Sequence, residues 1–286
     1  MKTIVKILLF FLLASLWLGG NPSYAMQFDD MDEIDDVGSS NDDGDSPEDI
    51  KPQVEVTKDD IRDLRDAKQK GLEPRLVTAA AKILGRDQNN LLALNTLAVF
   101  YFNDKKFGLA KIILNRALNA HPNQAALHNN LGVIYLSEGD QRAAIRSFKK
   151  SVEVDPDYVI GATNLASIYL EYRDFNRALE PLQSGYKVVK GSLREGKAES
   201  VGVANNLAVA LSAQKQADKA RDIYEEILRG NSRNITVLLN YAILLVERLK
   251  AKDEALKVIS KIKFIAESPK AIRQAEELEK KAKSLE

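Results

Sequence analysis

Apolar side chains recur at spacings of three and four residues along most of this 286-residue chain, and the whole pattern repeats every 34 residues. One series comprises Leu94, Leu97, Ala98, Tyr101, Ala110, Leu114, Ala117 and Pro122. The second comprises His128, Leu131, Gly132, Tyr135, Ala144, Phe148, Ser151 and Pro156. The third comprises Ala162, Leu165, Ala166, Tyr169, Ala178, Leu182 and Gly185. A helical period inside a fixed repeat predicts helix pairs that stack on their neighbours.

The residue types within one unit fit a helix, a turn and a second helix. Small residues at Ala98 and Ala110 let two helices approach closely, and Tyr101 fills the gap beside them. Pro122 ends the second helix, because proline cannot donate a helical hydrogen bond. Gly139 stands between the two helices of its unit, where a tight turn is needed. The chain is therefore predicted to be all-α.

Two later units depart from the 34-residue spacing. Val201 begins a fourth unit 42 residues after Val159, which leaves eight extra residues. We place them between Tyr186 and Ser200, where glycines interrupt the pattern, and expect a longer second helix with a loop. A fifth unit fits residues 235–267 if its turn is one residue longer.

The two ends of the array differ from its middle. Residues 57–90 keep the phase of the repeat but lack its aromatic residue and its pair of small residues, so we interpret them as a degenerate capping repeat. Ser268 and Pro269 form a helix start, and one apolar stripe and one charged face follow through 286. Such a helix is expected to solvate the end of the stack, which would otherwise expose its core face.

The repeated positions resemble those that define the tetratricopeptide repeat, over about residues 57–265. The resemblance implies an all-α, right-handed α-solenoid of stacked helix-turn-helix units. With the secretory signal predicted for residues 1–25, we expect an exported bacterial member of the family. The predicted order is a capping repeat at 57–90, repeats at 91–124, 125–158, 159–200 with the insertion, 201–234 and 235–267, and the terminal helix at 268–286.

Residues 1–25 have the order of a secretory signal peptide. Lys2 and Lys6 precede an apolar run, and the stretch closes on a small-x-small end at Ala25, after which we predict cleavage. A retained membrane anchor is the alternative, but the run breaks at Gly19–Pro22, short of the roughly 20 residues of a spanning helix. An exported chain without cysteine favours the bacterial periplasm.

Charge divides the rest of the chain into two parts. Eleven of the 41 acids and no Lys or Arg lie in 26–50, and 1–25 holds two of the 41 basic residues, so 51–286 carries 39 basic and 30 acidic residues. Residues 26–56 are therefore predicted to be an acidic, disordered linker. It is either a solubilising spacer or a segment that folds back over the basic body or docks a basic partner.

The first helix of each unit is expected to line the inner surface of such an array. In tetratricopeptide proteins that hold extended peptides, asparagines of these helices form a ladder along the groove, and the resemblance implies the same here. The alternative is that these amides bond within or between repeats. The candidate groove residues are Asn95, Asn130, Asn164, Asn206 and Asn240, with Phe102 and Leu136 as apolar anchors that would otherwise pack between repeats.

No Lys or Arg falls among the residues expected to face inward, which disfavours the carboxylate clamp of some family members. No nucleophile, metal-ligand spacing or phosphate-binding loop is apparent, and His121 and His128 read as structural, so no enzyme, cofactor or metal is predicted. We expect a scaffold of the cell envelope that binds protein segments, without nucleic acid and without a membrane span after signal cleavage; the oligomeric state is left open. A holdase-type chaperone and a regulatory subunit of a cell-wall enzyme are the alternatives.

Overall fold

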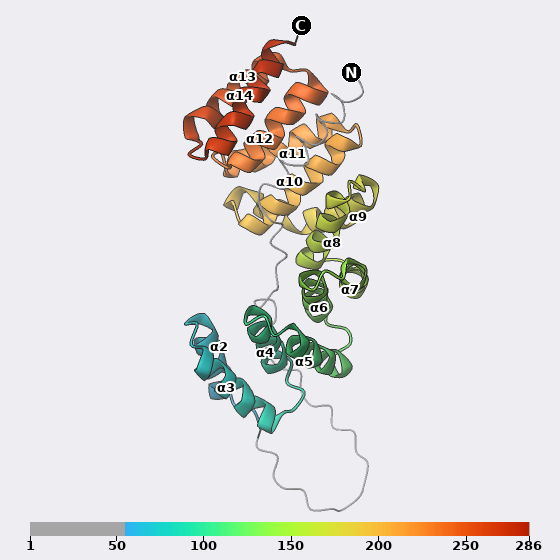
Figure 1. The fold of residues 1–286 in the computed structure, drawn as a ribbon, viewed down its shortest axis with the longest axis vertical. Helices are drawn as coiled ribbons and strands as arrows, with labels where there is room; N and C mark the ends of the chain where they lie inside the picture. Colours follow the sequence, from blue (N-terminus) through green and yellow to red (C-terminus); the bar gives the residue numbers. More distant parts are fainter. Residues whose placement is uncertain (1–54, 286) are drawn as a thin grey trace, which may run out of the picture. The chain divides into compact units, whose positions relative to one another are not determined.

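The computed structural model describes residues 55–285, so the predicted signal peptide and nearly all of the predicted acidic linker lie outside the described residues. Between 55 and 285 every regular element is helical, as the sequence predicts (Figure 1). The helices form two compact units that divide between Asp155 and Pro156. We call residues 55–155 the N-terminal unit and residues 156–285 the C-terminal unit.

Consecutive helices pair and stack within each unit. The N-terminal unit contains α2 (Lys58–Gln69), α3 (Glu73–Arg86), α4 (Leu91–Asn103), α5 (Phe107–Ala120), α6 (Ala125–Ser137) and α7 (Gln141–Val154). The C-terminal unit contains α8 (Val159–Glu171), α9 (Phe175–Val189), the 3₁₀ helix η2 (Lys190–Glu195), α10 (Ala198–Ala213), α11 (Ala217–Gly230), α12 (Ile235–Leu244), the π-helical turn η3 (Leu245–Leu249), α13 (Lys252–Ile265) and α14 (Pro269–Lys283).

Small residues set the close approach of the two helices in a pair. A Cβ added to Gly132 on α6 would lie 2.6 Å from Cε1 of Phe148 on α7, and the Phe148 ring is fully buried. The Ser151 hydroxyl, near the end of α7, donates a hydrogen bond to the carbonyl of Ala125 at 2.8 Å. The α6–α7 pair is therefore held by the Gly132–Phe148 contact and by the hydrogen bond between Ser151 and Ala125.

The turn inside each pair depends on one residue in the left-handed backbone region. Gly71 and Gly139 take this position in two hairpins, and basic residues take it in the others: Lys105, Arg173, Lys215 and Lys250. In the repeat of α4 and α5 the turn closes with a hydrogen bond from the Lys106 N–H to Tyr101, five residues earlier. In the fifth unit Ala251 bonds to Leu245, six residues earlier, so that turn is one residue longer.

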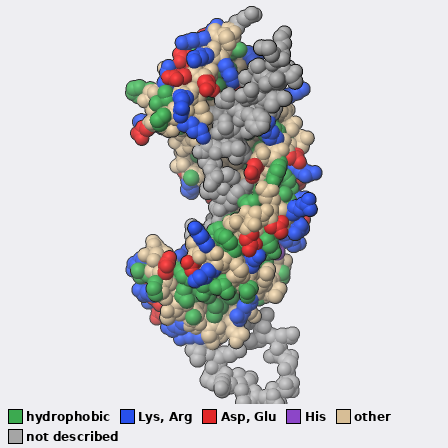
Figure 2. Space-filling model, in the orientation of Figure 1, with side chains coloured by type: hydrophobic (Ala, Val, Ile, Leu, Met, Phe, Trp, Pro, Cys, Tyr) green, Lys and Arg blue, Asp and Glu red, His purple; other side chains and the backbone are tan. Residues whose placement is uncertain are grey.

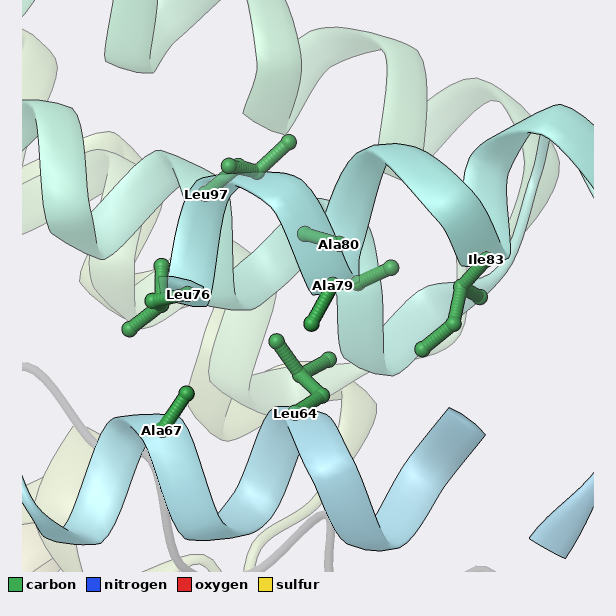
Figure 3. Close-up of a cluster of buried hydrophobic side chains, with 8 residues drawn as sticks. Leu64, Ala67, Leu76, Ala79, Ala80, Ile83 and Leu97 are labelled. Carbon is green, nitrogen blue, oxygen red and sulfur yellow. The ribbon is translucent and has the colours of Figure 1, made fainter. Parts of the chain in front are cut away.

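The hairpin of α2 and α3 packs its apolar faces together and onto α4. Figure 3 shows Leu64 of α2 pointing toward α3, whose side chains fill the space between the helices. The cluster comprises Leu64, Ala67, Leu76, Ala79, Ala80, Ile83, Ala93 and Leu97. Residues 57–90 thus share a core with the next helix pair.

The eight extra residues of the third repeat extend α9 and form η2. Leu193 of η2 is fully buried, and Val189 packs in a small cluster with Val159 and Val203. A Cβ added to Gly230, the last residue of α11, would lie 2.6 Å from Cα of Arg194. The insertion is thus a packed element that uses the missing side chain of Gly230 to approach α11.

Candidate peptide-binding amides

Side-chain amides from successive first helices meet in both units. The sequence places the candidate asparagines on α4, α6, α8, α10 and α12, and the helix packing brings α4 against α6, and α10 against α8 and α12. A stack of first helices offers neighbouring residues about 10 Å apart on one face. The two units differ in how far these amides are buried.

In the N-terminal unit the amides are buried and bonded to one another. The Asn130 Nδ2 donates to Asn95 Oδ1 at 2.8 Å, and the Asn129 Nδ2 donates to Asn130 Oδ1 at 3.3 Å. The exposed fraction is 2% for Asn95 and 0% for both Asn129 and Asn130. The inter-repeat bonding that the sequence left as an alternative is therefore present between α4 and α6.

In the C-terminal unit the same kind of amide chain reaches the surface. The Asn240 Nδ2 donates to Asn205 Oδ1 at 2.9 Å, and the Asn205 Nδ2 donates to Asn206 Oδ1 at 3.4 Å. Asn206 and Asn240 are half-buried, whereas Asn205 between them is buried. Among the described residues, Asn206 Nδ2 has no acceptor and Asn240 Oδ1 has no donor.

An amide chain of this kind always ends in one donor and one acceptor. If the side-chain amide oxygen and nitrogen of all three asparagines were exchanged, the free donor would lie at Asn240 and the free acceptor at Asn206. One free donor and one free acceptor would still be present. A peptide main chain presents both a carbonyl and an N–H. The half-buried ends at Asn206 and Asn240 can therefore bond a peptide backbone without regard to its side chains.

The two apolar residues of the predicted groove have a packing environment, and Asn164 is buried on α8, the next first helix. Phe102 and Leu136 are half-buried near the ends of α4 and α6. The Phe102 ring packs against Phe107 across the turn, with ring centroids 5.5 Å apart. Phe102 is thus in part a packing residue of its own hairpin.

Sequence reasoning did not identify Asn205 as the residue that connects Asn206 with Asn240. The signal for it is the 35-residue separation of the bonded pairs, Asn95 with Asn130 and Asn205 with Asn240. Equivalent positions of successive repeats are 34 residues apart, so each acceptor stands one position earlier in its repeat than its donor does. Comparing only equivalent positions therefore does not reveal these pairs.

A cluster of polar and charged side chains lies between α11, α12 and α13. The Tyr241 hydroxyl on α12 is within hydrogen-bond distance of Glu225 of α11, at 3.2 Å, and of Glu254 of α13, and its one proton is donated to one of them at a time; Glu254 also pairs with Arg221. Burial and the Glu254 carboxylate raise the pKa of Tyr241, so its hydroxyl remains a donor at neutral pH. This cluster joins three helices of the C-terminal unit.

Among residues 55–285, no helix is both long and apolar enough to span a membrane. The same residues bring together no group of three or more His, Asp or Glu side chains that could hold a metal ion.

Comparison with known proteins identifies the repeats. Profiles of the tetratricopeptide repeat family match residues 125–158 and 201–233. The chain is a tetratricopeptide-repeat protein. The helical pairs described above are therefore tetratricopeptide repeats, and the predicted fold class is confirmed. A stack of such repeats is a scaffold for protein–protein interaction.

Sequence relatives add little about function. The uncharacterized protein ycf37 of Pyropia yezoensis is 37% identical over 54 residues, which are 19% of this chain. The match spans only 30% of the length of that curated relative.

Several solved structures share the fold at low identity. YrrB, described as a tetratricopeptide-repeat protein with an unusual peptide-binding site, is 14% identical and superposes with a TM-score of 0.57, covering 70% of this chain and 99% of YrrB. The pilF protein of Pseudomonas aeruginosa is 22% identical, with a TM-score of 0.53 over 70% of this chain and 90% of its own. A tetratricopeptide repeat protein of Parabacteroides merdae is 16% identical, with a TM-score of 0.53 over 80% and 92%.

Proposed function

We propose that this chain is a non-catalytic scaffold of the bacterial cell envelope that captures an extended segment of a partner protein and so helps to assemble a larger complex. The observation that carries the proposal is the amide chain Asn240–Asn205–Asn206, with its unused donor and acceptor at half-buried ends. Because both ends belong to successive first helices, a segment that crosses α10 and α12 meets them in turn.

The proposal places the capture in the C-terminal unit. Asn95 and Asn130 are buried, and each amide already serves the other, so contact with a peptide would first require that bond to break. Asn206 and Asn240 require no such rearrangement. We therefore assign the backbone contacts to Asn206 and Asn240 and a packing role to Asn95 and Asn130.

The kind of segment follows from the chemistry of the surface. The residues expected to face inward include no Lys or Arg, so a terminal carboxylate finds no basic partner there. Main-chain groups and apolar side chains are the complementary features, and an extended segment offers both. One of the structural neighbours, YrrB, is described as having a peptide-binding site, which agrees with this use of the fold.

The location rests on the sequence pattern of residues 1–25. A basic start, an apolar run and a small-x-small end at Ala25 are typical of a signal peptide. Export followed by cleavage would leave the repeats in the periplasm. Mass determination of the chain recovered from a periplasmic extract tests this part separately, because it gives the new amino terminus; recovery of an intact leader would contradict cleavage.

The capture test compares the wild-type full chain with two variants in co-purification from envelope extracts. We expect Asn206→Ala with Asn240→Ala to reduce the recovered partner by about tenfold, since two lost hydrogen bonds cost roughly 1–2 kcal/mol together. Asn130→Ala is the matched control, because it removes an equivalent amide that is buried in the other unit. It is expected to lower the melting temperature and to leave capture unchanged below that temperature.

The composition of the captured material decides among the functions. One stoichiometric partner supports the scaffold, many unfolded clients indicate a holdase, and a cell-wall hydrolase or synthase indicates a regulatory subunit. Full capture by the Asn206→Ala, Asn240→Ala variant would show that these amides do not bind the segment.

A further inference from the structure

The outer face of α5 carries two large apolar side chains in contact with solvent. Leu109 and Ile112 lie one helical turn apart and keep 46% and 66% of their surface exposed. Figure 2 shows apolar side chains gathered over this part of the N-terminal unit. Single exposed apolar residues are ordinary, whereas neighbouring ones on one helix face need a reason.

The other repeats of the same chain provide the comparison. At the position of Leu109, the remaining second helices carry Arg75, Ala143, Arg177, Lys219 and Glu254. At the position of Ile112, they carry Thr78, Arg146, Glu180, Asp222 and Lys257. The fold therefore does not require an apolar residue at either place, and α5 alone among these helices has two.

The next hairpin of the same unit carries a basic surface. The exposed residues of α7 include Arg142, Arg146, Lys149 and Lys150, and Figure 2 shows Lys and Arg side chains gathered over that helix. Because α6 packs against both α5 and α7, these outer faces belong to successive hairpins of one unit.

Little negative charge within the described residues offsets this basic surface. Arg116, Arg142, Arg146 and Lys149 form no ion pair there. The neighbouring acid Glu138 is already paired with Lys111 at 2.8 Å. The two helices thus present apolar side chains beside uncompensated positive charge.

The chain itself contains a segment with the complementary pattern. Phe28, Met31, Ile34 and Val37 follow one another at every third position, and each interval between them holds two acids. The ten residues therefore carry four apolar side chains and six carboxylates. Apolar anchors flanked by acids match an apolar face flanked by arginine and lysine.

The length of the chain allows this segment to reach α5. Seventeen residues lie between Val37 and Glu55, and a random chain of that length has a root-mean-square span of about 25 Å. Its extended limit is about 60 Å. The path from the start of α2 to α5 crosses α3 and α4, roughly three helix spacings or about 30 Å.

We propose that residues 28–37 dock in cis on the outer face of α5 and α7, with their apolar side chains on Leu109 and Ile112 and their carboxylates beside Arg116, Arg142, Arg146 and Lys149. The acidic segment is then an intramolecular cover of the N-terminal unit. The site is separate from Asn206 and Asn240, so its test does not depend on the capture of a partner.

The absence of cysteine allows a direct test in the chain from residue 26 onward. Paired cysteines are introduced as Ser39→Cys with Asn115→Cys, and as Ser39→Cys with Ala81→Cys, and are joined by a short bismaleimide. Asn115 on α5 and Ala81 on α3 are exposed and occupy equivalent positions. Ala81 is closer in sequence to Ser39, so an undocked segment would favour it. We expect at least about fivefold more intramolecular product with Asn115→Cys.

Two variants identify the contacts. Ile112→Glu is expected to abolish the excess product, and Thr78→Glu, an exposed and equivalent position on α3, is the matched control that should retain it. Replacing Phe28, Met31, Ile34 and Val37 by serine keeps all six acids and is also expected to abolish the excess. Circular dichroism melting verifies that each variant is folded.

Three results would overturn the proposal. One is an equal yield for the two cysteine pairs. Another is product that joins heavy-isotope to light chains only, which would place the segment on a second copy. The third is unchanged cross-linking in Ile112→Glu together with lost binding to phosphatidylglycerol vesicles, which would assign the face to an anionic lipid surface.

Discussion

Asn130 and Asn95 face each other across the boundary between two repeats, with their amides 2.8 Å apart and almost completely buried. Asn130→Ala removes the donor and leaves the buried Asn95 oxygen without that bond, so we expect a loss of about 1–3 kcal/mol in unfolding free energy. Urea denaturation measures it.

A double-mutant cycle with Asn95→Ala separates this bond from other effects of the substitutions. Since each change removes one partner of the same pair, the double variant is expected to be less destabilised than the sum of the two singles. Additive losses would mean that the two amides stabilise the fold independently.

Gly132 gives the second prediction. An alanine methyl group at this position overlaps the fully buried Phe148 ring, so Gly132→Ala should cost about 1–3 kcal/mol. Gly202 inside α10 is the matched control, because nothing lies within 4 Å of its added Cβ. Gly202→Ala should stabilise the chain by about 0.5–1 kcal/mol. Thermal unfolding of both variants checks the contrast, and equal effects would contradict it.

Lys215 gives the third prediction, because its backbone φ of 62° lies in the left-handed region. Its exposed side chain forms no ion pair among the described residues, so glycine removes backbone strain without removing an attractive contact. Lys215→Gly should therefore raise the unfolding free energy by about 1 kcal/mol.

Gly139 occupies the equivalent turn, at φ 83°, and provides the reverse experiment. Gly139→Ala places a Cβ in the same disfavoured region and is expected to destabilise the chain by a similar amount. If Lys215→Gly instead lowered the unfolding free energy, the lysine would contribute more to stability than its left-handed backbone costs.

The paired helices could be predicted from the sequence because their contacts are local. The positions of Ala110 and Phe148 each recur every 34 residues in the first three repeats. The helix that carries each of them packs against the helix just before it in the chain. The tight turn at Gly139 could be predicted as well, because glycine marks it. Lys105 and Lys215 are not turn-forming residue types, and only the backbone angles reveal that they hold the same position.

The candidate amides could be named from the sequence, but their roles could not. Asparagine repeats at equivalent positions, yet the bond from Asn240 reaches Asn205, one position earlier in its repeat. That offset depends on how successive hairpins rotate against each other, which no local pattern encodes. Exposure likewise separates Asn206 from Asn130, although the two residues are equivalent in sequence.

Asp60 gives the last prediction, a dependence of stability on pH. Its buried carboxylate accepts hydrogen bonds from the Thr57 backbone and hydroxyl at the start of α2 and pairs with Lys82 and Arg86 of α3. The hydrogen bond with Lys82, then those from Thr57, and the charge of Arg86 hold the pKa of Asp60 well below its usual range. The capping box and one set of ion pairs between α2 and α3 therefore depend on the same ionised group.

The direction of the pH effect follows from the lowered pKa. Since the folded state binds the Asp60 proton less readily than the unfolded state does, the stabilisation is complete above the unfolded pKa of about 3.9 and is lost as pH falls toward the folded value. Wild type should thus exceed Asp60→Asn in urea midpoint from pH 7 to about 5, and the difference should shrink below about pH 4. Asp59→Asn, at an exposed neighbouring acid, is the control that should show no such advantage. A difference between wild type and Asp60→Asn that stays constant down to pH 3 would show that the charge of Asp60 does not stabilise the cap.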